Sequence, residues 1–295
     1  MTTARWRASG LLATVLLASG CFRHISKVQK IIPVADVKSA SLNELIRQIQ
    51  DRFDAIRTMT ASVDIVFSTG GSRQGKLTVY TTLSGYILLR KPEDLHVLLL
   101  LPLVRTTFVD MLTDGKTFKM LIPPQKRAIT GSNELAMPSK NPLENLRPAV
   151  FYDSLLIKGV QTGELVAMTS DARVYHPAPG RREVVSEPDY HVHLYTRKNG
   201  GSELETHRVI HVGRSTLLPY AQDIYDNEGH VVTRAAYDSY QKFENIELPT
   251  RITIERPLDE FKIVMTFTKV TSNQEMENDQ FELTIPPGTQ VQQLP

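Results

Sequence analysis

His191 and His193 are the residues best placed for metal chemistry, because they stand two apart in a run that alternates like a β-strand. Side chains two apart on a strand share one face, and Asp189 would lie on that face too. This set could ligate a metal ion, or it could be the solvated polar face of a sheet. His207 and His211 would lie about 13 Å apart on an extended strand, which is too far for one ion. We therefore expect no metal site, with the His191 face as the alternative.

Motifs that accompany common enzyme chemistries are missing from the sequence. There is no G-x-S-x-G nucleophile motif, no H-E-x-x-H metal motif and no phosphate-binding P-loop. Cys21 is the single cysteine, which excludes both an internal disulfide and a thiolate cluster. The acidic residues are scattered, as on a solvated sheet face. The sequence predicts a protein that is not an enzyme and needs no cofactor.

The N-terminal residues 1–20 have the pattern of an export signal. Arg5 and Arg7 form a basic start, and an apolar run follows from Leu11 to Leu17. That run is much shorter than the roughly 20 apolar residues that span a bilayer, so a cleaved signal fits better than an anchor helix.

Cys21 directly follows the small residues Ala18-Ser19-Gly20. This segment resembles the lipobox of bacterial lipoproteins, which implies cleavage before Cys21 and acylation of the new N-terminus; the alternative is an unmodified cysteine near a cleavage site. Several acyl chains, at about 0.8 kcal/mol per buried CH₂, would hold the protein on a membrane. Phe22 is not acidic, and by the same resemblance the lipoprotein would reach the outer membrane, facing the periplasm.

The charge balance gives no sign of a nucleic-acid partner. The chain has 34 Lys and Arg against 32 Asp and Glu, and loss of Arg5 and Arg7 with the signal leaves equal numbers. A neutral protein has no overall basic field for a polyanion. Residues 21–40 have mixed polarity and no clear period, so we expect a lipidated tether there and a single domain over residues 41–295.

The stretch from Leu83 to Pro124 predicts an antiparallel meander. Asp114-Gly115 between two apolar runs is a strong hairpin signal, because glycine accepts positive φ. The run Val97–Leu101 has no polar alternate, so both faces of its strand would be apolar. Each face then needs a cover, which is either ordinary core and helix or a cavity that holds an apolar ligand.

Two helices and many further strands complete the expected fold. Ser41–Arg57 begins with a capping box of Ser41 and Glu44 and carries an apolar stripe at helical spacing. Pro142–Leu156 is the second predicted helix. The expected strands outside the meander lie at Thr60–Phe67, Lys76–Thr82, Leu165–Met168, Tyr190–Thr196, Thr206–Val212, Ala221–Tyr225, His230–Tyr240, Thr250–Arg256, Lys262–Lys269 and Phe281–Ile285. The pattern predicts a mainly β, α+β protein with a curved antiparallel sheet or incomplete barrel and helices on one face.

The order of these motifs resembles the LolA/LolB-like lipoprotein-localisation superfamily of the bacterial envelope. The resemblance rests on Gly85–Pro92, Leu101-Pro102-Leu103, Thr113-Asp114-Gly115, Leu248-Pro249 and Phe281–Gly288, and covers about Ser41 to Leu294. It implies an incomplete antiparallel barrel, lidded by helices, around a hydrophobic cavity that shields acyl chains from water. The chain is longer than typical members, mainly between Val160 and Gly201.

The resemblance implies a receptor-like role in lipoprotein sorting to, or insertion into, the outer membrane, with a periplasmic carrier protein as a possible partner. In the receptors an exposed leucine after a proline hands cargo to the membrane, and Leu103 stands at that place; a buried turn residue is the alternative. We expect the cavity walls to come from Ile49, Phe53, Ile65, Phe67, Leu77, Val79, Leu95, Val97 and Leu99. The competing hypothesis is an envelope sensor or scaffold lipoprotein that uses the same fold to bind a protein.

Overall fold

The computed structural model describes residues 29–133, 147–177, 180, 182–198, 201–244 and 246–294. The chain divides into two compact units. The first contains residues up to Val34 together with Val174–Ser186, and the second contains Ala35–Arg173 and Glu187–Pro295. Cys21, the signal segment and the start of the predicted helix Pro142–Leu156 lie outside the described residues.

The first unit contains a short parallel strand pair. Strand β1 (Ile31–Pro33) aligns with the first residues of β10 (Val184–Arg197), with Ile31 opposite Val184. The Gln29 amide adds a 2.6 Å hydrogen bond to the carbonyl oxygen of Arg182. Residues 31–33 of the expected tether therefore form a strand. This strand pairs with Val184–Ser186, which belongs to the predicted domain of residues 41–295.

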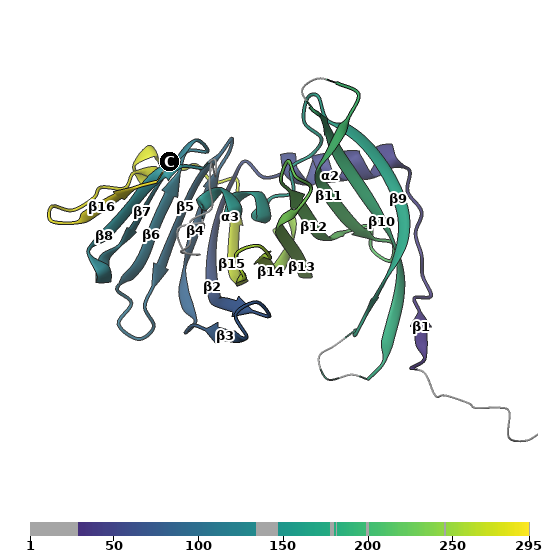
Figure 1. Cartoon of the computed structure of the whole chain (residues 1–295), viewed down its shortest axis with the longest axis horizontal. Coiled ribbons are helices and arrows are strands. Elements are labelled where there is room, and N and C mark those ends of the chain that lie inside the picture. The colour runs from purple at the N-terminus through teal and green to yellow at the C-terminus, as the bar shows by residue number, and fades with distance from the viewer. Residues whose placement is uncertain are drawn as a thin grey trace, which may run out of the picture. The chain divides into compact units, whose positions relative to one another are not determined.

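The second unit is built on one large sheet (Figure 1). Its strands follow the order β10-β11-β12-β13-β14-β15-β2-β4-β5-β6-β7-β8-β16, with β3 beside β2 and β9 beside β10. The bounds are β2 (Thr58–Gly71), β3 (Lys76–Val79), β4 (Leu83–Arg90), β5 (Asp94–Leu100), β6 (Thr107–Thr113), β7 (Thr117–Ile122), β8 (Arg127–Ser132), β9 (Leu165–Tyr175), β11 (Leu204–Gly213), β12 (Pro219–Tyr225), β13 (Val231–Phe243), β14 (Ile246–Arg256), β15 (Phe261–Ser272) and β16 (Gln290–Gln293). Within the described residues the end strands do not pair with each other. The expected mainly β fold, a sheet that does not close into a barrel, is confirmed.

Local chemistry explains the meander and the strand that begins it. Asp114 Oδ1 accepts hydrogen bonds from the backbone N–H groups of Lys116 and Thr117, and Gly115 has φ +88°, so the predicted Asp-Gly hairpin joins β6 to β7. Along β2, Ala61, Val63 and Ile65 are buried, and the residues that alternate with them are partly buried. This alternation places one apolar face of the sheet in the core.

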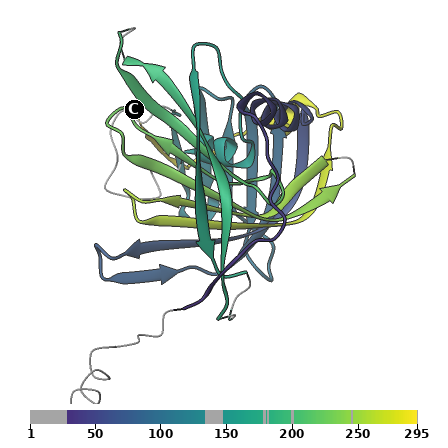
Figure 2. The ribbon, with the colours of Figure 1, turned by 90° about the vertical axis from the view of Figure 1, so that its right-hand side faces the viewer.

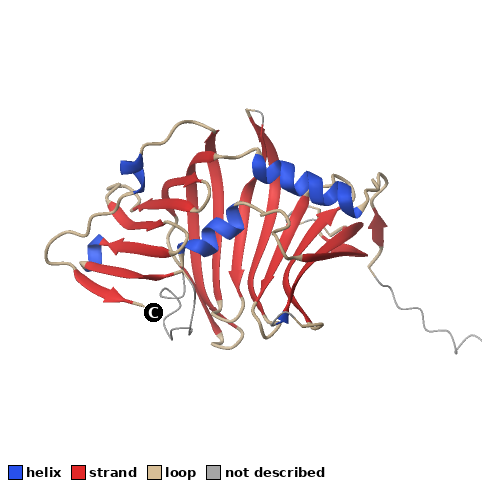
Figure 3. Cartoon of the chain, turned by 90° about the horizontal axis from the view of Figure 1, so that it is seen from above, coloured by secondary structure: helices blue, strands red, loops and turns tan. Residues whose placement is uncertain are grey.

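Helix α2 (Leu42–Asp54) begins at the predicted capping box. The Ser41 side chain accepts a hydrogen bond from the Glu44 N–H, while the Glu44 carboxylate accepts one from the Ser41 N–H at 2.7 Å. Leu45 and Ile49 are buried against a cluster on β10 and β11 that includes Val192. The helix lies across the sheet, as seen from above in Figure 3.

Helix α3 (Pro148–Leu155) begins with proline at its first position, where the missing N–H costs no hydrogen bond. Phe151, Tyr152 and Leu155 pack in the main core with the buried residues of β2, β4 and β5. Within the described residues the helix is slightly shorter than the predicted Pro142–Leu156, since Arg147 and Leu156 are its caps and lie outside it. No described helix has both the length and the apolar character needed to cross a bilayer.

The C-terminal segment corrects one expectation. Phe281–Ile285, predicted as a strand, is not a strand; a short 3-10 helix, η4 (Asn278–Phe281), leads into it. Leu283 packs with Leu121 and Ala128, next to Ile285. This segment covers part of the second apolar face of the meander, so that face is partly satisfied by the chain itself.

Candidate functional site

An apolar pocket of about 310 Å³ lies between helix α2 and the sheet of the second unit. Four segments far apart in the sequence build it: the C-terminal half of α2 with the residues after it, the end of α3 with the residues after it, the start of β12, and the corner between β13 and β14. Its lining residues are Ile49, Asp51, Arg52, Phe53, Ala55, Ile56, Leu155, Leu156, Ile157, Pro219, Tyr237, Tyr240, Ile246, Glu247, Leu248 and Pro249. The floor is therefore sheet, and the cover is helix.

The walls carry little polarity. Burial raises the pKa of Tyr237 well above its ordinary value, and it raises the pKa of Tyr240 as well, so both rings stay neutral at physiological pH. The Tyr240 hydroxyl donates a hydrogen bond to the carbonyl oxygen of Pro219 at 2.7 Å. This hydroxyl is therefore already paired within the pocket wall. The pocket thus offers an incoming molecule mainly hydrocarbon and aromatic surface, as small-molecule sites usually do.

Charged groups are confined to the rim. Asp51 and Glu247 are exposed and Arg52 is half-buried. The Arg52 Nη2 atom lies 2.9 Å from Glu247 Oε2, and this ion pair links α2 to β14. A ligand with an apolar tail and a polar end could therefore place its tail inside and its polar end in water.

The structure brings two of the nine predicted cavity residues into this pocket, Ile49 and Phe53. Phe67 is half-buried and its ring centroid lies 6.0 Å from that of Phe261. The four residues Ile65, Leu95, Val97 and Leu99 are buried in the main core. They pack against protein, and neither they nor Phe67 line the pocket.

Leu77 and Val79 lie on β3, with 64% and 62% of their surface exposed. Strand β3 pairs with β2 alone among the described strands, and Figure 2 shows this hairpin projecting from the sheet in dark blue. Tyr80, next in the chain, is 50% exposed. These residues form an exposed apolar edge that is separate from the pocket.

Leu103 is at the tip of the β5–β6 loop and is 99% exposed. The loop is closed by two backbone hydrogen bonds, from Leu101 N–H to Thr106 O at 2.9 Å and from Arg105 N–H to Leu101 O at 3.0 Å. Leu103 itself has φ +67°, a conformation that bulky residues rarely adopt. Val104 beside it is 66% exposed. The turn thus holds two apolar side chains in water, and the alternative of a buried turn residue is wrong.

The predicted histidine face exists on β10. His191 Nε2 lies 3.2 Å from Asp189 Oδ2, and the ring centroids of His191 and His193 are 6.3 Å apart. From the sequence, His211 was considered only together with His207; the structure places it opposite His191 in the ladder, with ring centroids 4.4 Å apart. His211 Nε2 in turn faces Asp223 Oδ2 at 3.3 Å. Each of these two rings already has a carboxylate partner, as in a half-buried polar network.

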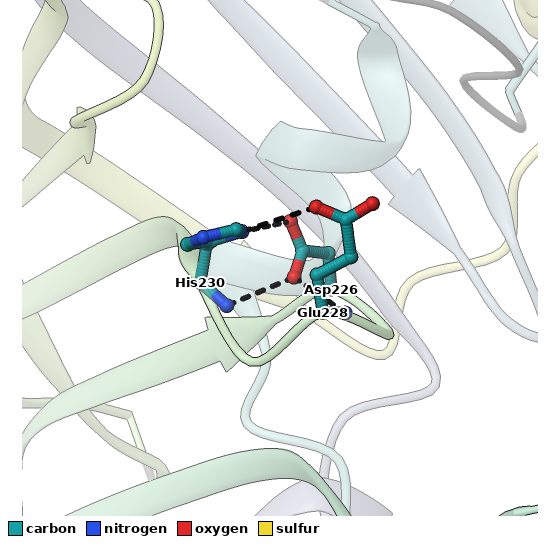
Figure 4. Close-up of side chains that lie close together, drawn as sticks. All are labelled: Asp226, Glu228 and His230. Carbon is teal, nitrogen blue, oxygen red and sulfur yellow. Dashed lines mark hydrogen bonds and ion pairs between the residues drawn. The ribbon is translucent and has the colours of Figure 1, made fainter.

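Asp226, Glu228 and His230 gather in the turn between β12 and β13 (Figure 4). Their potential metal-ligating atoms lie within 4.8 Å of one another. The Asp226 carboxylate also accepts hydrogen bonds from the backbone N–H groups of Glu228 and His230, each at 2.9 Å. This cap on an exposed hairpin turn accounts for the arrangement without an ion.

Several residues of the pocket were not predicted from the sequence. Tyr237 and Tyr240 were expected in the strand His230–Tyr240 without a site role, and Ile246–Pro249 lies before the predicted strand Thr250–Arg256. Their only sequence signal was Leu248-Pro249, which opens a strand in the motif order. A strand prediction does not reveal that the corner between β13 and β14 faces α2. That contact joins residues nearly 200 positions apart in the sequence, such as Arg52 and Glu247.

No family model matches the sequence, and no curated protein matches it. Among solved structures, the chain is similar to a LolA superfamily protein from Nitrosomonas europaea, with 14% identity, a TM-score of 0.48 and coverage of 81% of this chain and 97% of the other. It is similar to a putative outer membrane lipoprotein-sorting protein domain from Vibrio parahaemolyticus, with 11% identity, a TM-score of 0.49 and coverage of 81% and 94%. A DUF1329 family protein from Desulfovibrio piger has 18% identity, a TM-score of 0.47 and the same coverage.

Proposed function

We propose that this chain is a lipid-anchored protein of the bacterial envelope that binds acyl chains of lipids or lipoproteins in the pocket under α2. The pocket is the observation that carries the proposal. It is apolar, concave and covered by a helix, and it has charged residues only at its rim. Each methylene moved from water into such a site contributes about 0.8 kcal/mol, so an acyl chain supplies most of its own binding energy.

The membrane-facing part of the proposal rests on two further features. The Cys21 segment resembles a lipobox, and acylation there would tether the protein to the outer membrane, facing the periplasm. Leu103 and Val104 form an exposed apolar tip whose insertion into a bilayer would bring the protein surface close to lipid. Acceptance of cargo from a periplasmic carrier protein and its delivery to the outer membrane would use both features.

A binding test uses the whole chain carrying Cys21→Ser, which keeps its own N-terminus free of acyl chains. Mass spectrometry of the purified protein should recover co-purified lipids. Ala55→Trp should reduce that recovery severalfold, because Ala55 lines the pocket and an indole there would fill it. Asn43→Trp, at an exposed position of α2 that does not line the pocket, is the control and should retain the lipids. Lipid-free wild type, or equal recovery from both variants, would contradict the proposal.

The sorting role needs a separate test in cells. Depletion of the protein should leave other lipoproteins in the inner membrane, as measured by membrane fractionation. Normal distribution of lipoproteins after depletion would restrict the function to lipid binding.

A sensor or scaffold that binds a protein partner is the second candidate. The exposed apolar edge of Leu77, Val79 and Tyr80 favours it. Strand β3 pairs with β2 alone among the described strands, and such an edge can pair with an extended segment of another chain. This candidate predicts that the protein purifies without lipid and that Leu77→Glu disrupts its cellular role. Retention of that role by Leu77→Glu would count against it.

A further inference from the structure

A second, much smaller space shares part of its lining with the pocket. It measures about 10 Å³ and is lined by Met59, Leu155, Leu248, Pro249, Ile252, Phe267 and Val270. Three of these residues, Leu155, Leu248 and Pro249, also line the main pocket. These three form the wall between the two spaces, which we call the septum.

The void suits hydrocarbon and does not suit water. All seven lining residues are apolar, and most of them are buried in the main core. A water molecule needs two to four polar partners to be stable inside a protein, and the side chains of this lining offer none. The space beyond the septum is no larger than about one water molecule, so an apolar ligand could extend there only if the septum side chains rotate.

Two of the septum residues, Leu155 and Leu248, have rotatable side chains. Leucine side chains exchange between staggered rotamers at modest cost. Leu248 is half-buried on β14, and Leu155 is the last residue of α3, where the helix ends. Pro249 is different, because its ring is fixed to a backbone that pairs with Tyr240 in the β13–β14 ladder. Rotation of Leu155 or Leu248 would join the two spaces, whereas Pro249 stays in place.

The size of the pocket limits the number of chains. At about 310 Å³ it lies at the lower end of the roughly 300–1,000 Å³ that small-molecule sites span. A ligand with several acyl chains would need a site much nearer the upper end. The volume therefore fits one chain at a time.

We propose that the pocket holds a single acyl chain and that Leu155 and Leu248 set the length of chain it accepts. This inference rests on the proposed function, since it assumes that the pocket binds lipid. The ligand class is then a lipid that inserts one straight chain, tail first, towards Ile252 and Phe267, with its polar end at the rim. Longer chains would bind only when the septum side chains rotate.

The test measures how tightly the full-length protein with Cys21→Ser binds monoacylglycerols. Their acyl chains have about 10 to 18 carbons, which brackets common acyl lengths. The uncharged head group is constant, so chain length is the only variable. Displacement of an environment-sensitive fluorescent probe gives the affinity, and titration gives the stoichiometry. Wild type should bind one chain per protein and show a clear optimum length.

Variants of the septum should move that optimum. Leu155→Ala and Leu248→Ala each remove three side-chain carbons and should shift it to chains longer by about three carbons. Leu248→Phe, which fills space and does not create a cavity in the core, should shift it to shorter chains. Leu89→Ala is the control for Leu155→Ala, because Leu89 is buried in the same core as Leu155 but lines neither space.

The outcomes separate this inference from the function on which it rests. An optimum that stays the same in all septum variants, or a stoichiometry of two or more chains, overturns the inference and leaves lipid binding intact. A wild-type protein that binds no chain of any length overturns both. Should an alanine variant fail to fold, Leu248→Phe and Leu155→Val still report the direction of the shift.

Discussion

Arg52 Nη2 lies 2.9 Å from Glu247 Oε2, and this ion pair connects the cover of the pocket to its floor. Arg52 belongs to α2, while Glu247 is the second residue of β14, and both line the rim. Their side chains are 35% and 45% exposed, so solvent screens the pair. Exposed ion pairs contribute about 0–1 kcal/mol, which is enough to bias a helix position without fixing it.

Breaking this pair should change ligand exchange more than stability. Arg52→Ala or Glu247→Ala should lower the free energy of unfolding by less than about 1 kcal/mol. Either variant should release a bound acyl chain several times faster, because α2 loses its link to β14. Stopped-flow dissociation of a fluorescent fatty acid measures the rate. Glu255→Ala, which breaks an exposed pair with Lys262 away from the pocket, is the control; equal acceleration in all three variants would exclude a specific role of the rim pair.

Glu187 is a buried carboxylate whose loss should destabilise the second unit. Its Oε2 accepts hydrogen bonds from Arg173 Nε at 2.8 Å and Nη2 at 2.5 Å, and its Oε1 accepts one from the Ser215 N–H at 3.0 Å. Hydrogen bonds to charged groups contribute about 1.5–3 kcal/mol each when a partner is removed. Glu187→Gln should therefore lower the unfolding free energy by about 2 kcal/mol in urea denaturation.

The same carboxylate should make stability fall in acid. Burial acts to raise the pKa of Glu187, but the hydrogen bonds from Ser215 and Arg173 outweigh it, and the net pKa is lowered. A group with a lowered pKa in the folded state stabilises the fold above its unfolded pKa and loses that effect as pH drops through the folded value. The deficit of Glu187→Gln relative to wild type should accordingly be full at pH 7 and shrink in strong acid. A deficit independent of pH would contradict this assignment.

His96 should contribute with the opposite pH dependence. Burial acts to lower the pKa of His96, but its hydrogen bonds to Asp110, at 2.7 Å, and to the Gln280 carbonyl oxygen, at 2.6 Å, together raise it. A raised pKa in the folded state gives stability that is complete below the unfolded pKa of about 6.5 and lost as pH rises through the folded value. The interaction also holds the C-terminal segment on β5.

Thermal unfolding of wild type and His96→Gln at several pH values tests this link. The melting temperature of His96→Gln should lie further below that of wild type at about pH 5.5 than at about pH 8.5. Both pH values are about one unit or more from the ordinary histidine pKa. His230→Gln, in the exposed β12–β13 turn, is the control and should show a smaller change. A His96→Gln deficit that grows with pH would reverse the sign and contradict the assignment.

Local sequence patterns predicted the elements well because their causes are local. The Ser41–Glu44 capping box and the Asp114-Gly115 hairpin each depend on residues a few positions apart, and both are confirmed. The predicted strand Thr60–Phe67 is likewise observed, within β2. Phe281–Ile285 shows the limit of this signal. It alternates like a strand, yet Leu283 packs onto the outer face of β7 and β8 from a segment outside the sheet.

The candidate site was harder to predict because it depends on distant contacts. Ile49 and Phe53 were found from helical spacing, but their partners at Tyr237, Tyr240 and Leu248 come from a corner that only the folded chain brings near α2. Leu77 and Val79 alternate just as buried strand residues do. Among the described strands, however, β3 pairs with β2 alone, and both side chains are exposed. The alternation of apolar residues does not show whether another element covers a strand.

Leu103 should contribute directly to membrane association. Its side chain is 99% exposed, and two backbone hydrogen bonds close the loop that carries it. The side chain is therefore exposed without any membrane present. Full burial of a leucine is worth about 1.5–3 kcal/mol, and about 1.4 kcal/mol changes an equilibrium tenfold. With Cys21→Ser to remove the anchor, Leu103→Glu should therefore lower partitioning into uncharged phosphatidylcholine vesicles by about 10-fold to 100-fold in a sedimentation assay. Leu77→Glu is the matched control, since Leu77 is also an exposed leucine but lies on β3. An equal loss in both variants would show that general surface hydrophobicity, and not the β5–β6 tip, drives the association.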